Sequence, residues 1–383
     1  MAGMGHPRVA TLATLIAALV ACLPAATATA AKRTVPRGFH GVDYDREVSW
    51  APQDVQTRMW AEMARTGVES ARVVFDWSEA QKEPGVPTSF HETDPIVRQA
   101  ASHGVDLLPV VLYAPTWARV LPQAKESAPS STSAYAAYLK ELVARYGPRG
   151  TFWAENPSLR KRPIRAWQVW NEPDMEYQWK PREGWMEGYG ALLDAAATAL
   201  READPRAEVV LAALTNVSWD TLDQLYDAGR IAGNFDAVAL NAYTKVPKNL
   251  IEVIRRGRRV MRDRGDGDLP IRVTEFGASA SAGRIVSPGN EHLQVTDDKL
   301  ARLVTRGFDE LARYRRSLGI ESAYWYTWAS SYDPSAAIFD FSGLISYGPD
   351  GTKRRPALRA YRNSARRYEA CAKDSAGACV KRR

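Results

Sequence analysis

Eight short apolar segments alternate with helical patterns between residues 39 and 366, and this alternation constrains the fold more than any other feature of the sequence. The segments are rich in β-branched and aromatic residues, as is typical of parallel strands that are buried on both faces. The strand candidates are Phe39–Val42, Ser70–Phe75, Asp106–Tyr113, Ala166–Trp170, Glu208–Ala212, Ala237–Asn241, Ile271–Thr274 and Ser322–Thr327. The sequence therefore predicts an α/β protein with a parallel sheet.

Helical patterns fill the gaps between these strands. The candidates are Asp54–Arg65, Ile96–Ser102, Ser133–Tyr146, Glu187–Glu202, Leu222–Ala228, Leu250–Arg262, Asp297–Leu318 and Pro356–Arg366. Glycines that follow four of these helices are expected to form left-handed C-caps, namely Gly67, Gly104, Gly147 and Gly319. No Gly/Ser-rich linker or internal repeat interrupts the pattern, and no G-x-G-x-x-G follows the first strand. Eight units in a single domain favour a closed (β/α)8 TIM barrel over an open doubly wound sheet.

The N-terminus has the layout of a signal peptide. Arg8 gives a positive start, Val9–Ala21 is apolar but short for a membrane span, and Ala28–Ala30 fits a cleavage site made of small residues. We therefore predict that residues 1–30 are a signal peptide and that the protein is exported, with no integral membrane span.

Two segments are expected after the signal peptide, a barrel over residues 31–368 and a C-terminal tail over residues 369–383. The tail holds Cys371 and Cys379, and an oxidising compartment permits a disulfide between them, whereas their spacing excludes a C-x-x-C redox or zinc site. The remaining cysteine, Cys22, ends a Leu-Val-Ala-Cys sequence that resembles the box before a lipid-modified bacterial cysteine. A secreted protein and a lipid-anchored protein are therefore both open.

The positive charge is spread along the chain, which has a formal net charge of +7. The cluster Arg255–Arg259 is interpreted as the solvated face of a helix, with binding to an anionic polysaccharide or cell-wall surface as the functional alternative. No recognisable nucleic-acid module accompanies the charge, so we expect no nucleic-acid partner.

Two of the candidate strands end in a glutamate. Asn171 and Glu172 follow the fourth strand and precede Pro173, which cannot donate to a sheet ladder, and Glu275 ends the seventh strand. The C-terminal strand ends of a (β/α)8 barrel form its active site, so both carboxyl groups are expected there. Our hypothesis is a retaining glycosidase in which Glu172 is the acid/base and Glu275 the nucleophile, about 5–5.5 Å apart. Ordinary ion pairs at the barrel end are the alternative.

These motifs resemble those of the retaining glycoside hydrolases of clan A, in particular the family 39-like and family 5-like enzymes. In that clan the acid/base follows an Asn in a Trp-Asn-Glu-Pro sequence, which Trp170–Pro173 matches. The nucleophile ends strand seven in a Thr-Glu-Phe-Gly-like sequence, which Thr274–Gly277 matches. The resemblance covers nearly the whole mature chain and implies hydrolysis of O-glycosidic bonds, expected to be β-linked, in a poly- or oligosaccharide.

The resemblance also implies roles for residues near the two glutamates. Arg72 is expected beside the nucleophile, Tyr243 in contact with it, and Asn171 at the sugar 2-hydroxyl. Trp77, Trp117 and Trp328 are candidate sugar-stacking residues, with core packing as the alternative reading of each. His40 lies in the first strand and is open to a site role or a hydrogen-bonded structural role. Asn241 stands where relatives carry the His of a His-Pro-Tyr sequence, so the pocket lining differs from theirs.

Two further functions remain open at the level of sequence. A non-catalytic carbohydrate-binding barrel needs neither glutamate, and a transglycosylase uses the same residues with a sugar as the acceptor. The chain has no Gly-x-Ser-x-Gly elbow and no His-Glu-x-x-His motif, and we expect neither a metal nor a cofactor. The sugar, the linkage, endo or exo action and the oligomeric state are open.

Overall fold

The computed structural model describes residues 1–5, 33–44, 46–49, 51–215, 217–333, 335, 337–373 and 379–380. The chain divides into two units, Met1–Ala31 and Lys32–Arg383. All of the described helices and strands belong to the second unit. The predicted apolar run of the signal peptide, its cleavage site and Cys22 lie outside the described residues.

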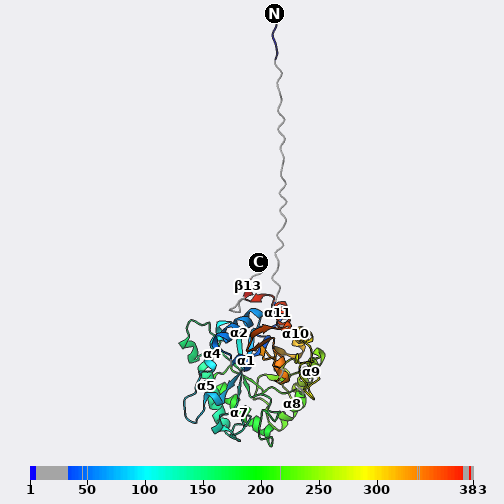
Figure 1. The fold of residues 1–383 in the computed structure, drawn as a ribbon. Helices are drawn as coiled ribbons and strands as arrows, with labels where there is room; N and C mark the ends of the chain where they lie inside the picture. Colours follow the sequence, from blue (N-terminus) through cyan, green and yellow to red (C-terminus); the bar gives the residue numbers. More distant parts are fainter. Residues whose placement is uncertain are drawn as a thin grey trace. The chain divides into compact units, whose positions relative to one another are not determined.

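Eight parallel strands form the sheet that organises this unit (Figure 1). They are β1 (His40–Tyr44), β2 (Ser70–Asp76), β3 (Asp106–Leu112), β4 (Ala166–Val169), β5 (Glu208–Val210), β6 (Val238–Asn241), β7 (Ile271–Phe276) and β8 (Ile320–Trp325). The sheet order is β5-β4-β3-β2-β1-β8-β7-β6, and isolated parallel bridges from Val210 to Ala237 and from Leu214 to Leu240 join its two ends. The predicted (β/α)8 barrel is confirmed, and each observed strand overlaps its predicted segment.

Helices surround this barrel (Figure 1). Those that match the predicted helices are α2 (Gln53–Thr66), α4 (Thr93–Ser102), α5 (Thr132–Tyr146), α7 (Trp185–Ala203), α8 (Ser218–Asp227), α9 (Pro247–Asp263), α10 (Asp297–Leu318) and α11 (Pro356–Glu369). The shorter elements are α1 (Arg46–Ser49), α3 (Trp77–Ala80), η1 (Thr116–Ala118), α6 (Thr151–Glu155), β9 (Ala329–Ser330), η2 (Ile338–Phe341), β10 (Ile345–Gly348), β11 (Gly351–Arg354), β12 (Ala372–Lys373) and β13 (Cys379–Val380). Among the described residues, no helix combines the length and the apolar character that a membrane span requires.

The glycine caps illustrate what local sequence can and cannot fix. Gly67, Gly104 and Gly319 have positive φ angles of 100°, 70° and 63°, as predicted for left-handed caps. The prediction for Gly147 is wrong, because its φ is −67° and its backbone is extended. A glycine is required there for steric reasons, because an added Cβ would lie 2.5 Å from the carbonyl oxygen of Val143.

The interpretation of the Arg255–Arg259 cluster as a solvated face needs one correction. Arg255 and Arg256 do lie on the surface, where both pair with Glu252. Arg258, however, is only 3% exposed. It donates hydrogen bonds to the carbonyl oxygens of Leu318, Gly267 and Leu269 at 2.7–3.0 Å, so it ties α9 to the start of β7 and the end of α10.

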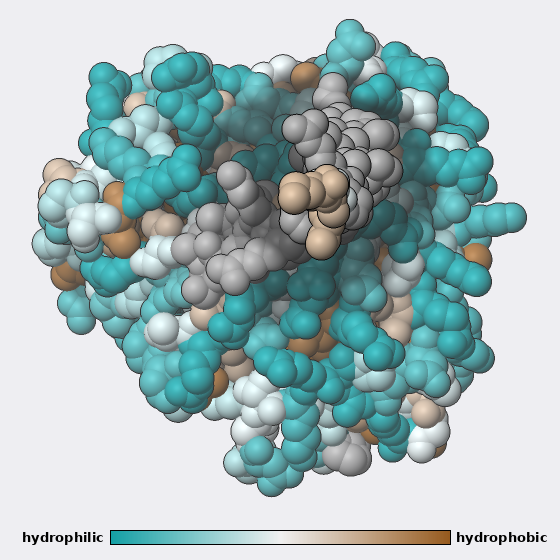
Figure 2. All heavy atoms as spheres, turned by 90° about the horizontal axis from the view of Figure 1, so that it is seen from above, coloured by the Kyte–Doolittle hydropathy of each residue, from teal (hydrophilic) through white to brown (hydrophobic). Residues whose placement is uncertain are grey.

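The surface seen from above in Figure 2 is mostly hydrophilic, with small scattered apolar areas.

In the C-terminal tail, Cys371 is disulfide-bonded, and β12 pairs antiparallel with β13 so that Lys373 lies opposite Cys379. Pairing of Cys371 with Cys379 remains a prediction.

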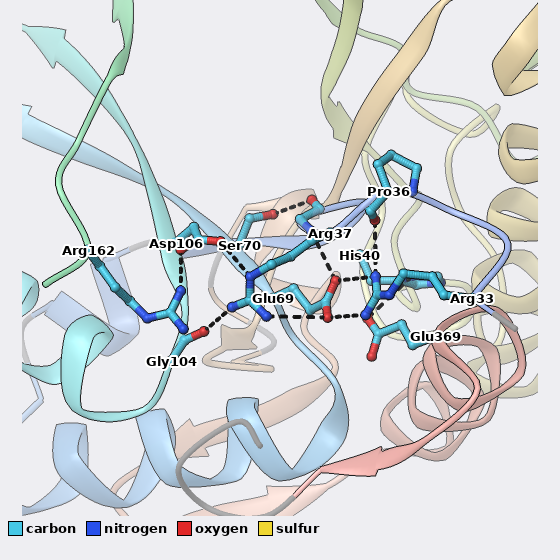
Figure 3. A network of polar contacts seen from close by, with 11 residues as sticks. Arg33, Pro36, Arg37, His40, Glu69, Ser70, Gly104, Asp106, Arg162 and Glu369 are labelled. Carbon is cyan, nitrogen blue, oxygen red and sulfur yellow. Dashed lines mark hydrogen bonds and ion pairs between the residues drawn. The ribbon is translucent and has the colours of Figure 1, made fainter. Parts of the chain in front are cut away.

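A polar network joins the first residues of β1, β2 and β3 (Figure 3). Its centre is Glu69, which is 2% exposed and accepts hydrogen bonds from Arg33 at 2.5 and 2.9 Å and from the backbone N–H of Gly38 at 3.0 Å. Arg37 donates to Gly104 and Asp106 in the same network. These bonds fasten the residues before β1 to the N-terminal end of the barrel.

We expect Arg33→Ala to lower the free energy of unfolding by about 2 kcal/mol, because it removes charge-assisted hydrogen bonds from a buried carboxylate. Arg58→Ala is the matched control, since Arg58 pairs with Asp54 on the exposed face of α2 and should contribute less than about 1 kcal/mol. Denaturant unfolding of both variants measures the difference. Equal losses would contradict a special role for the buried Glu69 pair.

Candidate active site

A cavity of about 560 Å³ lies at the carboxyl ends of the barrel strands. Every strand, or the loop that follows it, contributes a residue to its wall. These residues include Asp43, Arg72, Leu112, Glu172, Thr215, Asn241, Glu275 and Tyr326. The structure thus brings together all of the predicted polar site residues except His40.

Glu275, the last residue but one of β7, lies in a cationic and hydrogen-bonded setting. Its Oε1 accepts a hydrogen bond from Arg72 at 2.6 Å, and its Oε2 accepts one from the hydroxyl of Tyr243. Burial lowers the pKa of Arg72, but the negative charges of Asp43 and Glu275 outweigh it and raise that pKa above its usual range. A permanent cation and a phenol therefore fix the position of the Glu275 carboxylate.

Glu172 has a different environment, although it lines the same cavity. Its side chain accepts hydrogen bonds from the amide of Asn241 at 2.7 Å and from the hydroxyl of Tyr177 at 3.0 Å. Burial, together with the negative charge of Glu275, raises the pKa of Glu172 to about 7. Neutral donors hold Glu172, whereas a guanidinium holds Glu275. Environments that differ in this way separate a proton donor from a nucleophile.

The backbone turn after β4 places Glu172. Trp170 and Glu172 both have positive φ angles, 69° and 44°, which are uncommon outside glycine. The N–H of Glu172 donates to the carbonyl oxygen of Ala213 at 2.9 Å, and Asn171 bridges to the same residue. These contacts with the segment after β5 stabilise the unfavourable backbone conformation of Trp170 and Glu172. Such conformations are common at functional sites.

Arg72 also orients the amides around the cavity. It donates to Gln168 at 2.9 Å, to Asn171 at 2.6 Å and to Asp43 at 2.8 Å. Because Arg72 occupies the carbonyl oxygen of Asn171, the amide nitrogen is the atom left to bind a ligand in the cavity. Asn241 is held in a similar way, since its carbonyl oxygen accepts from Thr274 at 2.9 Å while its amide donates to Glu172.

His40 lies outside the cavity and belongs to the network at the opposite end of the barrel (Figure 3). Its fully buried ring stacks on Phe308 with centroids 4.5 Å apart, and Nε2 lies 3.3 Å from the hydroxyl of Ser364. Burial lowers its pKa to about 3. Of the two sequence interpretations, the structure supports the hydrogen-bonded one, because the first residue of a strand lies far along the barrel from its carboxyl end.

The three candidate tryptophans are also absent from the cavity wall. Trp77 is buried against Tyr138, and Trp117 packs edge-on against Trp77 and donates to the carbonyl oxygen of Gln81. Trp328 is fully buried. Core packing, the alternative weighed for each, describes Trp77 and Trp328, while Trp117 is 36% exposed beside that core.

Other residues line the cavity without having been singled out from the sequence. They are Asp43, Tyr44, Tyr113, Tyr177, Tyr326 and Phe339, among others. Asp43 lies near the end of β1, so the rule that carboxyl ends of strands form the site was a usable signal for it. Tyr177 lies in an irregular loop where no periodicity predicts its direction. In the part of the chain that the structure describes, no cluster of three or more His, Cys, Asp or Glu side chains is arranged to hold a metal ion.

Solved glycosidases share this fold. A family 39 glycoside hydrolase from the gut symbiont Bacteroides cellulosilyticus WH2 superposes with a TM-score of 0.65 at 16% identity, over 88% of this chain and 64% of that one. A monomeric β-xylosidase from Caulobacter crescentus CB15 gives 0.64 at 17% identity, over 87% and 69%. A family 1 β-glucosidase from Thermotoga maritima gives 0.60 at 12% identity, over 88% and 99%.

The chain has the (β/α)8 fold of the clan A glycoside hydrolases. The resemblance suggested by the sequence motifs is thus confirmed for the fold. This chain covers slightly less than two thirds of the first of those proteins, 64% of its length. No protein-family profile and no curated protein matches the sequence.

The raised pKa of Glu172 has a consequence for stability. In the folded protein the pKa is about 7, against an ordinary value of 4.5, so the folded state holds this proton more tightly than the unfolded chain does. The free energy of unfolding therefore falls as the pH rises from about 4.5 to about 7. Glu172→Gln removes this loss, and we expect it to stabilise the protein more at pH 8 than at pH 5, by on the order of 3 kcal/mol.

Denaturant unfolding at the two pH values measures this difference. The matched control is Glu252→Gln on α9, because hydrogen bonds from Arg256 and Arg255 lower the pKa of Glu252. Glu252→Gln should therefore be less stable than the wild type at pH 8, whereas Glu172→Gln should be more stable. A pH-independent effect of Glu172→Gln would contradict the raised pKa.

Proposed function

We propose that this protein is an exported retaining glycoside hydrolase that cleaves β-linked O-glycosidic bonds in a poly- or oligosaccharide. The observation that carries the proposal is the contrast between two buried carboxyl groups in one cavity. Arg72 and Tyr243 hold Glu275, whereas burial raises the pKa of Glu172 to about 7. The proposal of export rests on the signal peptide predicted from the sequence. The exported protein is either secreted or anchored by a lipid on Cys22.

In the first step, a carboxylate oxygen of Glu275 attacks the anomeric carbon and forms an ester while the bond to the leaving oxygen breaks. Glu172 gives its proton to that oxygen, so the leaving group departs as a neutral alcohol. A carboxyl group with a pKa near 7 is largely protonated in mildly acidic water and about half protonated at neutral pH, which suits this role. Glu172 is left as a carboxylate.

In the second step, Glu172 takes a proton from a water molecule, which attacks the anomeric carbon. The ester bond to Glu275 breaks, and the carboxylate returns to Arg72 and Tyr243. Two inversions at the same carbon give net retention of configuration. The amide nitrogen of Asn171 is placed to donate to the sugar 2-hydroxyl, a contact that strengthens as the transition state forms.

We expect Glu275→Gln to lower kcat/KM for an aryl β-glycoside by at least about a thousandfold, because an amide cannot form the ester intermediate. A panel of aryl β-glycosides and soluble β-glucans identifies the sugar in the wild type. Glu252→Gln serves as the control and should retain full activity, since Glu252 lies on the exposed face of α9. Full activity of Glu275→Gln, or a product of inverted configuration, would contradict the proposal.

The pH profile tests the assignment of Glu172. We expect kcat/KM to fall on the alkaline side with an apparent pKa near 7, because the proton donor is lost there. Tyr177→Phe removes a hydrogen bond that favours the carboxylate form, so the pKa of Glu172 should rise and the alkaline limb should move to higher pH. Tyr347→Phe on β10 is the control and should leave the limb in place. An unshifted or acid-shifted limb in Tyr177→Phe would contradict the assignment.

A further inference from the structure

A groove of about 290 Å³ lies beside the loops that follow β6 and β7. Four basic side chains contribute to its wall: Lys245, Lys299, Arg302 and Arg306. The last three lie on the first turns of α10, which runs next to α9 (Figure 1). Spacings of three and four residues place them along one face of that helix.

No carboxylate contributes to this wall, and none of the four cations has a carboxylate partner within 4.0 Å among the described residues. Elsewhere on the surface, exposed arginines are commonly paired. Arg264, for example, binds both Asp223 and Asp227. The four cations repel one another because they line the same groove without a carboxylate partner. A ligand with several negative charges would relieve that repulsion.

The groove has the composition of a polymer subsite. Pro247, Val295 and Leu303 give it an apolar component on which a sugar ring can lie, and Gln294 adds an amide. Guanidinium groups bind carboxylates and sulfates through paired N–H donors. The combination suits a sugar chain that carries anionic groups.

The groove adjoins the catalytic cavity through both loops. After β6, Tyr243 lines the cavity and Lys245 lines the groove. After β7, Leu293 lines the cavity and the next residue, Gln294, lines the groove. A sugar chain that leaves the cavity across these two loops therefore reaches the four cations.

The cavity itself is not arranged for an anionic sugar. Of the described residues that line it, Arg72 alone is positively charged, and its donors are taken by Asp43, Gln168, Asn171 and Glu275. An anionic group at the cleavage point would face the carboxyl groups of Glu172 and Glu275 without a free cation. The positive charge lies outside the cavity, where neighbouring sugar units would bind.

We propose that this groove is a subsite for the carboxylate or sulfate groups of an anionic polysaccharide, whose neutral sugar unit occupies the catalytic cavity. This proposal rests on the proposed glycosidase function, because a subsite binds sugar units next to a point of cleavage. Binding of the anionic chain to the groove can nevertheless be measured apart from turnover.

The test uses the full chain carrying Glu275→Gln, so that no ligand is consumed. Three further changes, Lys299→Gln, Arg302→Gln and Arg306→Gln, remove charge from the groove. The matched control removes the same charge from exposed, unneutralised arginines elsewhere, through Arg313→Gln, Arg316→Gln and Arg366→Gln. The probes are hyaluronan oligosaccharides, their carboxyl-reduced neutral form, dextran sulfate and duplex DNA, each titrated at two salt concentrations.

We expect the groove variant to lose at least tenfold in affinity for hyaluronan or for dextran sulfate, with a weaker salt dependence, while the control keeps its affinity. Whichever of the two polymers binds more tightly identifies carboxylate or sulfate as the recognised group. An Arg302→Lys, Arg306→Lys variant should keep most of the affinity, which separates charge from folding. Equal loss in the control, no loss in the groove variant, equal binding of the neutral form, or tighter binding of DNA would each overturn the proposal.

Turnover of a neutral aryl glycoside by proteins that retain Glu275 separates the two proposals. The groove changes should leave that turnover intact, since none of the three residues touches the cavity. Absence of all turnover together with groove-dependent binding would remove the glycosidase proposal and leave a polyanion-binding barrel. Turnover without groove-dependent binding would remove the subsite alone.

Discussion

The arrangement of the site depends on one buried guanidinium. Arg72 reaches from β2 to Asp43 on β1, Gln168 on β4, Asn171 after β4 and Glu275 on β7. A buried cation is stable only when its donors are satisfied and its charge is balanced, and these four partners do both. Without it, the carboxyl groups of Asp43 and Glu275 would share a poorly solvated cavity with no counter-charge.

The same interaction creates the difference between the two glutamates. Arg72 offsets the charge of Glu275, while Glu172 lies across the cavity with neutral donors and has a pKa near 7. This arrangement costs stability at neutral pH, and the left-handed backbone at Trp170 and Glu172 adds to the cost. The polar network around Glu69 lies at the opposite end of the barrel, so the stability that it contributes does not depend on the cavity.

The two ends of the barrel thus have different physical tasks. At the N-terminal strand ends, charges are paired with one another, and the buried Glu69 is held by Arg33 and by the backbone of Gly38 (Figure 3). At the C-terminal strand ends, charges line open space in the cavity and in the groove beside it. Strands and helices supply the rigid frame, and the loops after β6 and β7 link the proposed chemistry to proposed recognition of a longer chain.

The sequence by itself determined the order of the strands and helices, because their periodicities and end signals are local properties. It also determined that Glu172 and Glu275 lie at one end of the barrel, because both follow apolar strand segments and the carboxyl ends of the strands meet there. The place of Arg72, the third residue of β2, was implied only by the resemblance. Only the tertiary structure decided the positions of His40, Trp77, Trp117 and Trp328. A buried aromatic ring follows whichever space its neighbours leave, and that space is set by segments far away in the sequence. For the same reason the parts played by Asp43 and Tyr177 emerged only when the loops were in place, as did the meeting of Lys245 with the basic face of α10.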